Sequence, residues 1–346
     1  MFDCAEDVTA YHDDKVTLPQ AERDEMRGRR DANRDRLRAG LAKNEKPKPV
    51  EIASQGSYSM RTMVQHTDKD YDIDDGAYFA KEELIGPKGG EMSALETRQM
   101  VRDALAVDGR FKKEPEVRDS CVRVFYDEGY RIDVPAYRRT KTKDALGVDT
   151  FRFELAGPDW RESDARAVTR WFEKRNEILS PDKENGRQFR RVVRLAKKFG
   201  RSRDTWKGRM ASGFMITKLC SDCFQPASER DDVALRRTLE AVRDRLKSSL
   251  VVQHPVLLGE TISKGNNDPK AAFLRDKLEE NLEHLKTLDE PTCDHEQALK
   301  AWGDFFNDPW FRGRAKEPDK AGAAFIFGTT GPDRPAVDKQ GGGRYA

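Results

Sequence analysis

Residues 55–76, with the sequence QGSYSMRTMVQHTDKDYDIDDG, constrain the fold of this chain most strongly. The short, half-apolar segment 50–54 runs directly into them and predicts a β-strand that enters a tight Gly-Ser turn. In an extended chain alternate side chains share a face, so Asp70, Asp72 and Asp74 point the same way. The sequence therefore predicts two or three carboxylates that converge on one spot.

Such a cluster suits a divalent cation and a phosphate. Carboxylates that lie close together repel each other unless cations neutralise them, and hard oxygen ligands favour Mg²⁺, with Mn²⁺ as an alternative. Gly56 allows a phosphate to approach the backbone N–H groups of the turn, and the Ser57 hydroxyl can donate to a phosphate oxygen. Asp75 is expected on the opposite face. The alternative is an acidic, solvated loop, because the stretch is also rich in turn-forming residues.

A further carboxylate lies downstream. Residues 122–126 and 130–137 flank an Asp-Glu-Gly turn and predict a hairpin whose second strand carries Asp133 among β-forming residues. Two-metal phosphoryl transfer needs a ligand from a neighbouring strand, and Asp133 is expected to supply it and to orient or deprotonate an attacking hydroxyl. The alternative for Asp133 is a strand-end residue that faces water. Tyr137 either stacks on a base or packs in the sheet.

Taken together, Gly56-Ser57, Asp72-Ile73-Asp74 and the segment 130–135 (YRIDVP) resemble the motifs of the bacterial cyclic GMP-AMP synthase-like nucleotidyltransferases. These proteins are relatives of the animal cyclic GMP-AMP synthase within the polymerase-β-like superfamily. The resemblance implies an α+β fold, in which a catalytic palm with a mixed β-sheet faces a helical second lobe. A nucleotide pocket is expected between the two parts.

The resemblance also implies roles for individual residues. The expected site consists of phosphate-binding residues, which are Gln55, Gly56 and Ser57, and of catalytic metal ligands, which are Asp72, Asp74 and Asp133. Family members use a helical lysine and a following serine to hold donor triphosphate oxygens, and Lys197 and Ser212 occupy similar places. Lys198 is almost as good a candidate. The alternatives are a solvated basic face for either lysine and an ordinary helix N-cap for Ser212.

The expected activity is the synthesis of a purine cyclic di- or trinucleotide second messenger, of the cyclic GMP-AMP type, from ATP, GTP or both. The resemblance suggests an antiphage signal that acts on a separate effector. The alternatives are a template-independent nucleotidyltransferase or polymerase that acts on RNA, and an inactive nucleotide-binding sensor. The chain has 64 basic and 62 acidic residues, and this near-neutral balance argues against the extended basic groove that strong nucleic-acid binding needs.

The chain divides into four expected segments. These are an N-terminal helical brace (1–48), the palm (49–155), the helical lobe (156–315) and a flexible Gly- and Pro-rich tail (316–346). Helices are expected at 23–43, 164–179, 210–219, 231–252 and 271–288. The absence of a long apolar run and the acidic N-terminal residues predict a soluble, cytoplasmic protein without membrane contact.

Three smaller features complete the expectations. Cys220 and Cys223 are the only close pair among five cysteines, and without a second pair they favour buried free thiols over zinc. His66 is expected to be structural or solvent-facing, since no nucleophile-base arrangement is evident. Residues 341–346 form either a disordered end or, as in some family members, a handle through which a conjugating enzyme attaches the protein to partners.

Overall fold

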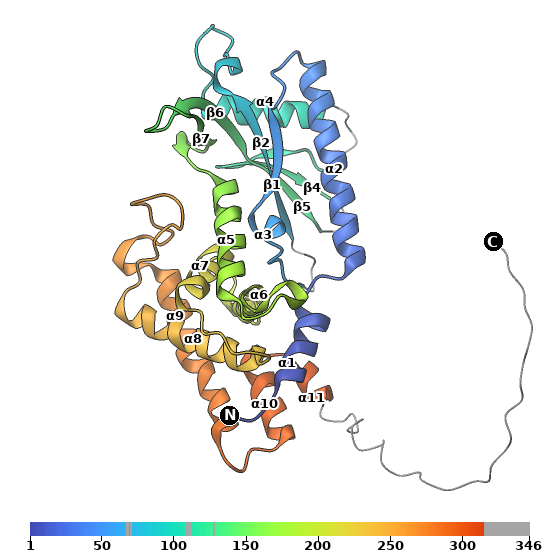
Figure 1. The fold of residues 1–346 in the computed structure, drawn as a ribbon. Helices are drawn as coiled ribbons and strands as arrows, with labels where there is room; N and C mark the ends of the chain where they lie inside the picture. Colours follow the sequence, from blue (N-terminus) through green and yellow to red (C-terminus); the bar gives the residue numbers. More distant parts are fainter. Residues whose placement is uncertain (67–68, 70, 108, 110–111, 127–128, 315–346) are drawn as a thin grey trace, which may run out of the picture.

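The computed structural model describes residues 1–66, 69, 71–107, 109, 112–126 and 129–314 (Figure 1). Asp70 and the expected tail lie outside these residues. The helices are α1 (Ala5–Tyr11), α2 (Gln20–Lys43), α3 (Gly56–Ser59), α4 (Ala94–Ala106), α5 (Ala165–Leu179), α6 (Gln188–Gly200), α7 (Gly213–Cys223), α8 (Asp231–Ser248), α9 (Pro269–Leu282), α10 (His295–Phe306) and α11 (Trp310–Arg314). The strands are β1 (Glu51–Gln55), β2 (Asp72–Ala80), β3 (Glu116–Val117), β4 (Val122–Phe125), β5 (Arg131–Val134), β6 (Ala136–Lys143), β7 (Asp149–Ala156) and β8 (Trp160–Glu162).

A mixed sheet forms the palm, and β2 lies at its centre (Figure 1). The strand order is β3-β4-β5-β2-β6-β7-β8, and β1 pairs with β2 antiparallel. Both β5 and β6 run parallel to β2 in the same register, so they are one strand interrupted at Pro135. The proline has no N–H to donate, but its carbonyl accepts a hydrogen bond of 2.9 Å from Ala77 N. The predicted strand 130–137 therefore continues across the proline.

Helices α2 and α4 cover one face of this sheet and enclose the palm core. The buried carboxylate of Asp75 points to this side, where Arg34 of α2 donates to it over 2.7 Å and 2.5 Å and Ser54 donates over 2.9 Å. Asp75 thus lies on the opposite face from Asp72 and Asp74, as the alternation of a strand predicts. A bidentate, buried ion pair therefore fixes α2 to the central strand.

The second lobe is helical and has its own core. Helices α6 to α11 pack around large apolar side chains, among which Phe199, Trp302, Phe305 and Phe306 are fully buried. The arrangement confirms the predicted α+β fold with a sheet-containing palm and a helical lobe. Helix α1 belongs to the lobe core, whereas α2 belongs to the palm core, so the residues grouped in one expected brace lie in two cores. None of the described helices combines the length and apolar character that crossing a membrane requires.

The expected helices exist, and their ends differ by a few residues. Helix α7 begins at Gly213, three residues later than predicted, because the Ser212 side chain caps it. Helix α8 ends at Ser248, and the chain passes into an extended residue at Ser249. Helix α9 gives way after Leu282 to a 3₁₀ segment, Glu283–Asp289. The Gly-Ser turn is in fact a single helical turn, α3.

Two glycines of α2 provide a matched test of the packing between α2 and α4. A Cβ at buried Gly40 would collide with the carbonyl oxygen of Ala104, whereas a Cβ at exposed Gly28 meets nothing within 4 Å. We expect Gly40→Ala to lower the free energy of unfolding by about 1–3 kcal/mol, because overpacking forces the helices apart. Gly28→Ala should raise it by about 0.5–1 kcal/mol through helix propensity.

Urea unfolding of both variants, followed by circular dichroism, measures this difference. A Gly40→Ala protein as stable as the Gly28→Ala protein would show that the close approach of α2 to α4 is not required.

Candidate active site

Strand register places the three predicted carboxylates together. In the parallel pairing of β2 with β5, Asp74 lies directly opposite Asp133, and Asp72 lies opposite Arg131. Side chains two residues apart on a strand share a face, so Asp72, Asp74 and Asp133 all point into the same space. All three line one cavity, of about 710 Å³. The structure therefore brings together the carboxylates that lie about 60 residues apart in the sequence.

Arginines hold two of these carboxylates. Arg123 of β4 donates to both oxygens of Asp133, over 2.8 Å and 2.7 Å, and Arg131 donates to Asp72 over 2.7 Å. Among the described residues, no hydrogen bond or ion pair reaches Asp74. Burial, followed by the charges of Asp133 and Asp72, raises the pKa of Asp74 to about 7. Asp74 is thus a half-buried carboxyl group that no Arg or Lys side chain of the described residues pairs with.

Gly56 lets the turn after β1 lie against this carboxylate. Its φ of +65° is in the left-handed region, and a Cβ there would collide with the Asp74 carboxylate. Both the positive φ and the closeness of the Asp74 carboxylate therefore require a glycine at position 56, whatever ligand the site holds. Gly56 and Ser57 both line the cavity. They remain the predicted phosphate contacts, and their position next to Asp74 is consistent with this.

Gln55 and Tyr137 are already engaged with each other. The Gln55 amide donates to the Tyr137 hydroxyl over 3.0 Å and accepts from the Tyr78 hydroxyl over 3.2 Å. The rings of Tyr78 and Tyr137 stack at 4.5 Å, and burial raises the pKa of Tyr137 to about 12. Of the two alternatives for Tyr137, packing is the one observed. The side chain of Gln55 has a structural role here, which leaves its backbone for any phosphate contact.

Helix α6 of the helical lobe carries the opposite side of the cavity and grips the loop that follows α3. Arg190, Arg194 and Lys197 recur at the spacing of one helix face. They donate in order to the backbone carbonyls of residues 60–62, over 3.1 Å, 2.7 Å and 3.3 Å. This row of bonds connects the palm loop to the helical lobe, and its last member reaches the cavity.

Lys197 and Lys198 are now clearly distinguished. Lys197 lines the cavity, is buried, and donates to the Thr62 hydroxyl over 2.8 Å, whereas Lys198 is not part of the cavity wall. Burial, with a smaller effect of the Arg201 charge, lowers the pKa of Lys197 to about 7. No carboxylate of the described residues pairs with Lys197, so this side chain could accept an anion.

Ser212 is an ordinary helix N-cap, as the alternative to a phosphate contact predicts. Its hydroxyl oxygen accepts from Met215 N over 3.1 Å and caps α7. A Cβ at the neighbouring Gly213 would lie 3.4 Å from Lys197 Cε, so this glycine lies beside the Lys197 side chain. Ser212 thus sets the start of α7 beside Lys197, and a direct phosphate contact by its hydroxyl stays a prediction.

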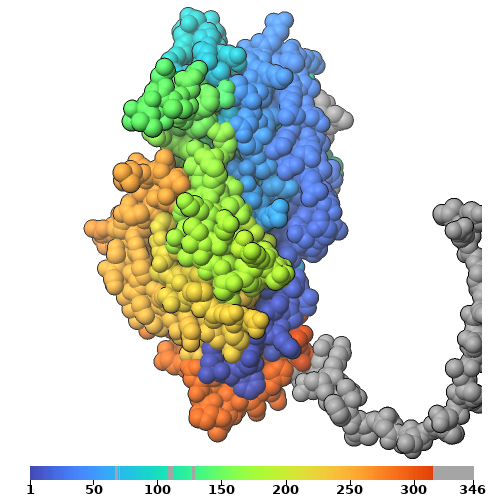
Figure 2. Space-filling view, viewed as in Figure 1, coloured from blue at the N-terminus to red at the C-terminus, as the bar shows by residue number. Residues whose placement is uncertain are grey.

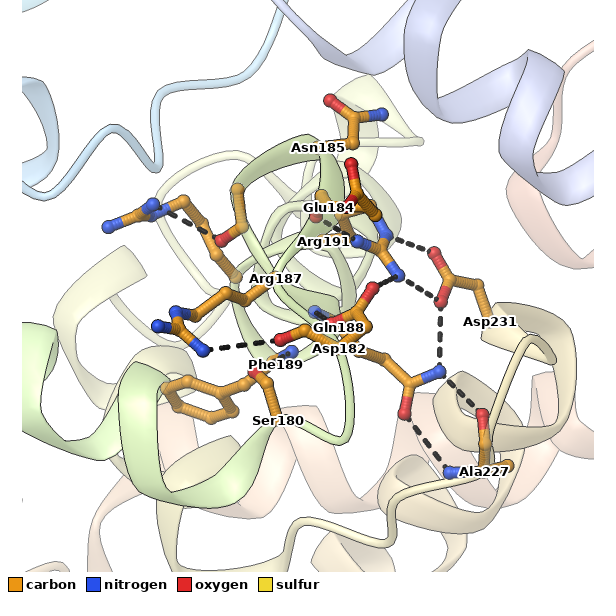
Figure 3. A network of polar contacts seen from close by, with 12 residues as sticks. Ser180, Asp182, Glu184, Asn185, Arg187, Gln188, Phe189, Arg191, Ala227 and Asp231 are labelled. Carbon is orange, nitrogen blue, oxygen red and sulfur yellow. Dashed lines mark hydrogen bonds and ion pairs between the residues drawn. The ribbon is translucent and has the colours of Figure 1, made fainter.

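A polar network anchors the N-terminal end of α6 (Figure 3). Arg191 donates to Asp231 of α8 over 2.5 Å and 2.9 Å and also pairs with Asp182 at 2.7 Å. Gln188 donates to Asp231 over 3.0 Å and exchanges bonds of 2.6 Å and 3.0 Å with Ala227. These contacts fix the direction of α6 and thereby the position of Lys197.

Sequence reasoning missed several residues of the site. Thr62, Arg123 and Arg201 lie outside the quoted motifs, and Arg131 lies inside one without a role assigned to it. Only the strand pairing and the loop path bring these residues to the carboxylates or to Lys197. One signal was available for Arg123, because a hairpin centred on the predicted turn places it opposite Asp133. The expected buried thiols are present, since Cys220 and Cys223 are both buried and free.

The cavity lies between palm and lobe, because strand residues and residues of α6 and α7 line it together. On the face drawn in Figure 2, residues of α5 (green) extend between the palm (blue) and the lobe (yellow). The wall formed by β2 and β5 is acidic, and the wall formed by α6 is basic through Lys197 and Arg201. Such a separation of charge suits a ligand that carries a triphosphate.

Comparison with known proteins identifies the palm. Residues 50–137 match the model of the cyclic GMP-AMP synthase DncV-like nucleotidyltransferase domain. Residues 50–137 therefore form a DncV-like nucleotidyltransferase domain. The match includes the Gly-Ser turn and all three carboxylates, and it confirms the predicted family.

Relatives agree with this assignment. The cyclic GMP-AMP synthase of Escherichia albertii is 25% identical over 234 residues, which are 65% of this chain and 48% of the relative. The chain therefore spans about half the length of that curated relative. Structurally, Escherichia coli DncV bound to 3′-deoxy GTP has a TM-score of 0.65 at 15% identity, over 84% of this chain and 92% of its own. CdnC of E. coli MS115-1 with ATP has a TM-score of 0.62 at 16% identity, over 88% and 98%. Similarity at this level of identity shows a shared fold.

The donor set of the DncV-like site fits a divalent cation by its chemistry. Burial and the neighbouring charges of Asp133 and Asp72 raise the pKa of Asp74, and a divalent cation would offset both effects. Within the described residues no three acidic, His or Cys side chains are already arranged around a metal position. Two of the three carboxylates, Asp133 and Asp72, are instead paired with Arg123 and Arg131.

The titration of Lys197 predicts that triphosphate binding takes up a proton. With a pKa near 7, about half of the free protein carries a neutral Lys197 at pH 7. A polyanion favours the charged form, so the pKa of Lys197 should rise on binding. Proton uptake should approach about one per site near pH 8.5 and should fall below pH 6, where the free lysine is already charged.

Calorimetry of nucleotide binding in buffers of different ionisation enthalpy measures this uptake. Lys197→Met should abolish it, and Lys198→Met is the matched control that should leave it intact. Equal uptake in wild type and Lys197→Met would assign the proton to another group.

Proposed function

We propose that this protein is a cyclic oligonucleotide synthase that joins purine nucleotides from ATP, GTP or both. The observation that carries the proposal is the register of β2 and β5, which aligns three carboxylates across a cavity from Lys197 and Arg201. A cavity of about 710 Å³ is within the range of small-ligand sites. The named activity of the E. albertii relative supports the cyclic GMP-AMP type of product.

Each residue has a role in this proposal. Asp72 and Asp74 hold Mg²⁺ or Mn²⁺, and Asp133 completes the metal site and orients the acceptor hydroxyl. When bound, two such ions stabilise the attacking and leaving oxygens of the in-line displacement. Gly56 and Ser57, with the backbone of Gln55, contact the donor phosphates from the palm.

The helical lobe supplies the remaining phosphate contacts. Lys197 reaches the donor phosphates from α6, and Arg201, which also lines the cavity, adds positive charge there. Ser212 positions the first turn of α7 next to Lys197.

A small, bounded product fits the site better than a polymer does. Residues of both palm and lobe line the cavity, and the sequence balances 64 basic against 62 acidic residues. A template-independent polymerase requires a longer basic track for its nucleic acid. An inactive sensor would not need three carboxylates in one register. These observations support synthesis of a short, closed product over both alternatives.

The proposed partners are ATP and GTP as substrates and a separate effector that binds the cyclic product in antiphage signalling. DncV of Vibrio cholerae has been solved with the linear intermediate 5′ pppA(3′,5′)pG, and CdnC with a HORMA protein. These complexes support nucleotide substrates for the fold. Conjugation at residues 341–346 stays a prediction, since these residues lie outside those that the structure describes.

The central test replaces the carboxylates of Asp72 and Asp74 with neutral amides of nearly the same shape. We expect Asp72→Asn with Asp74→Asn to reduce synthesis from radiolabelled ATP and GTP by about 10³-fold or more, because metal binding contributes several kcal/mol to the transition state. Thermal unfolding should show an intact fold, because the substitutions remove repulsion rather than packing. Asp149→Asn, an exposed aspartate of β7, is the matched control with normal activity. A folded double variant with normal synthesis would contradict the proposal.

Product analysis tests ring closure. We expect products of two or three nucleotides that resist phosphatase, because a closed ring has no terminal phosphate. Digestion with phosphatase and then with linkage-specific nucleases, followed by mass spectrometry, checks this. A ladder of long chains that phosphatase shortens at their ends would favour the polymerase alternative.

A further inference from the structure

One ring nitrogen of His254, a residue in the cavity wall, is fixed as a hydrogen-bond donor. Its Nδ1 accepts from Val256 N over 3.3 Å and from Leu257 N over 3.0 Å. A nitrogen that accepts N–H bonds carries no proton, so in the neutral ring the proton resides on Nε2. Burial lowers the pKa of His254 below its ordinary value, which favours this neutral form.

The loop that carries His254 is closed by backbone bonds. His254 N donates to Glu260 O over 2.8 Å, and Ile262 N donates to Val252 O over 2.7 Å. These bonds and the two that Nδ1 accepts determine the orientation of the ring. Within the described part of the chain, Nε2 makes no hydrogen bond. The Nε2–H group is therefore an oriented donor that is available to a ligand in the cavity.

A flat apolar surface lies beside this donor. The ring of Phe214 meets the ring of His254 edge to face, with centroids 5.6 Å apart and planes at 68°. Phe214 also lines the cavity, and it directly follows Gly213, which lies beside Lys197. The proposed phosphate end and this pair of rings are thus neighbours along α7. An aromatic surface next to a phosphate site is suited to a nucleobase.

We propose that His254 and Phe214 form a nucleobase subsite in which Nε2–H of His254 donates to a carbonyl oxygen of the base and so selects a 6-oxopurine over a 6-aminopurine. The inference rests on the proposed function, since it assumes a nucleotide in this cavity. Guanine presents the acceptor O6 at this position, whereas adenine presents the donor N6–H₂. Two donors that face each other both stay unpaired, and unpaired buried donors are costly.

The test compares binding of the α,β-methylene analogues of GTP, ITP and ATP, in which the bond that the enzyme would cleave is blocked. ITP keeps the 6-oxo group and lacks the 2-amino group, so it isolates the contact in question. The wild-type full-length protein, with Mg²⁺ present, should bind the GTP and ITP analogues more tightly than the ATP analogue. Isothermal titration calorimetry measures all three affinities.

His254→Asn is the diagnostic variant. An asparagine oxygen can accept the same backbone N–H bonds and preserve the turn, but the shorter side chain offers no donor at the place of Nε2. We expect about tenfold weaker binding of the GTP and ITP analogues, whereas the ATP analogue should bind as well as before or more tightly, because its N6–H₂ group no longer faces an unpaired donor. Leu258→Ala, at a fully exposed position of the same loop, should alter none of the three affinities.

Other outcomes separate this inference from the proposed function. If His254→Asn lowers the affinity for all three analogues equally, or changes none of the affinities, base selection by His254 is refuted while nucleotide binding stands. A wild-type protein that prefers the ATP analogue to the ITP analogue also refutes it. A wild-type protein that binds no analogue would overturn the proposed function together with the inference.

Discussion

The parallel pairing of β2 with β5 is the constraint on which the site depends. It places Asp74 directly opposite Asp133, with Asp72 two residues away on the same face. Like charges that share one face of neighbouring strands repel each other, and this repulsion requires compensation. Arg123 and Arg131 neutralise the two outer carboxylates, and the central one shifts its pKa instead. Burial and the charges of Asp133 and Asp72 together raise this pKa, and strongly perturbed carboxyl groups of this kind cluster at functional sites.

The opposite wall depends on a different interaction. Three cations of α6 bind consecutive carbonyls in the loop just after Gly56-Ser57, and the last of them is Lys197. The network of Figure 3 fixes the other end of the same helix to α8. One helix therefore connects the lobe core to the palm loop. A change in the position of α6 would move Lys197 and the loop together, which couples this wall of the cavity to the packing of the lobe.

The sequence predicted the features that depend on neighbouring residues better than those that depend on contacts between particular side chains. The strand 130–137, the helix α2 and the opposite orientations of Asp74 and Asp75 follow from local alternation and periodicity, and all are observed. Helix ends were less accurate, because Ser212 moves the start of α7 through a side-chain cap that periodicity does not detect. Tyr137 had two alternatives, and its contact with Tyr78 and Gln55 shows packing.

The sequence by itself determined which residues could do the chemistry, because Gly56, Asp72, Asp74 and Asp133 lie in local patterns that imply a turn and strands. Only the tertiary structure decided how these residues are held and what faces them. The choice of Lys197 over Lys198 depends on which side of α6 is buried against residue 62. The donor state of His254 likewise depends on two backbone N–H groups of its loop. Such contacts arise from packing between distant segments, and a one-dimensional pattern of residue types does not encode their geometry.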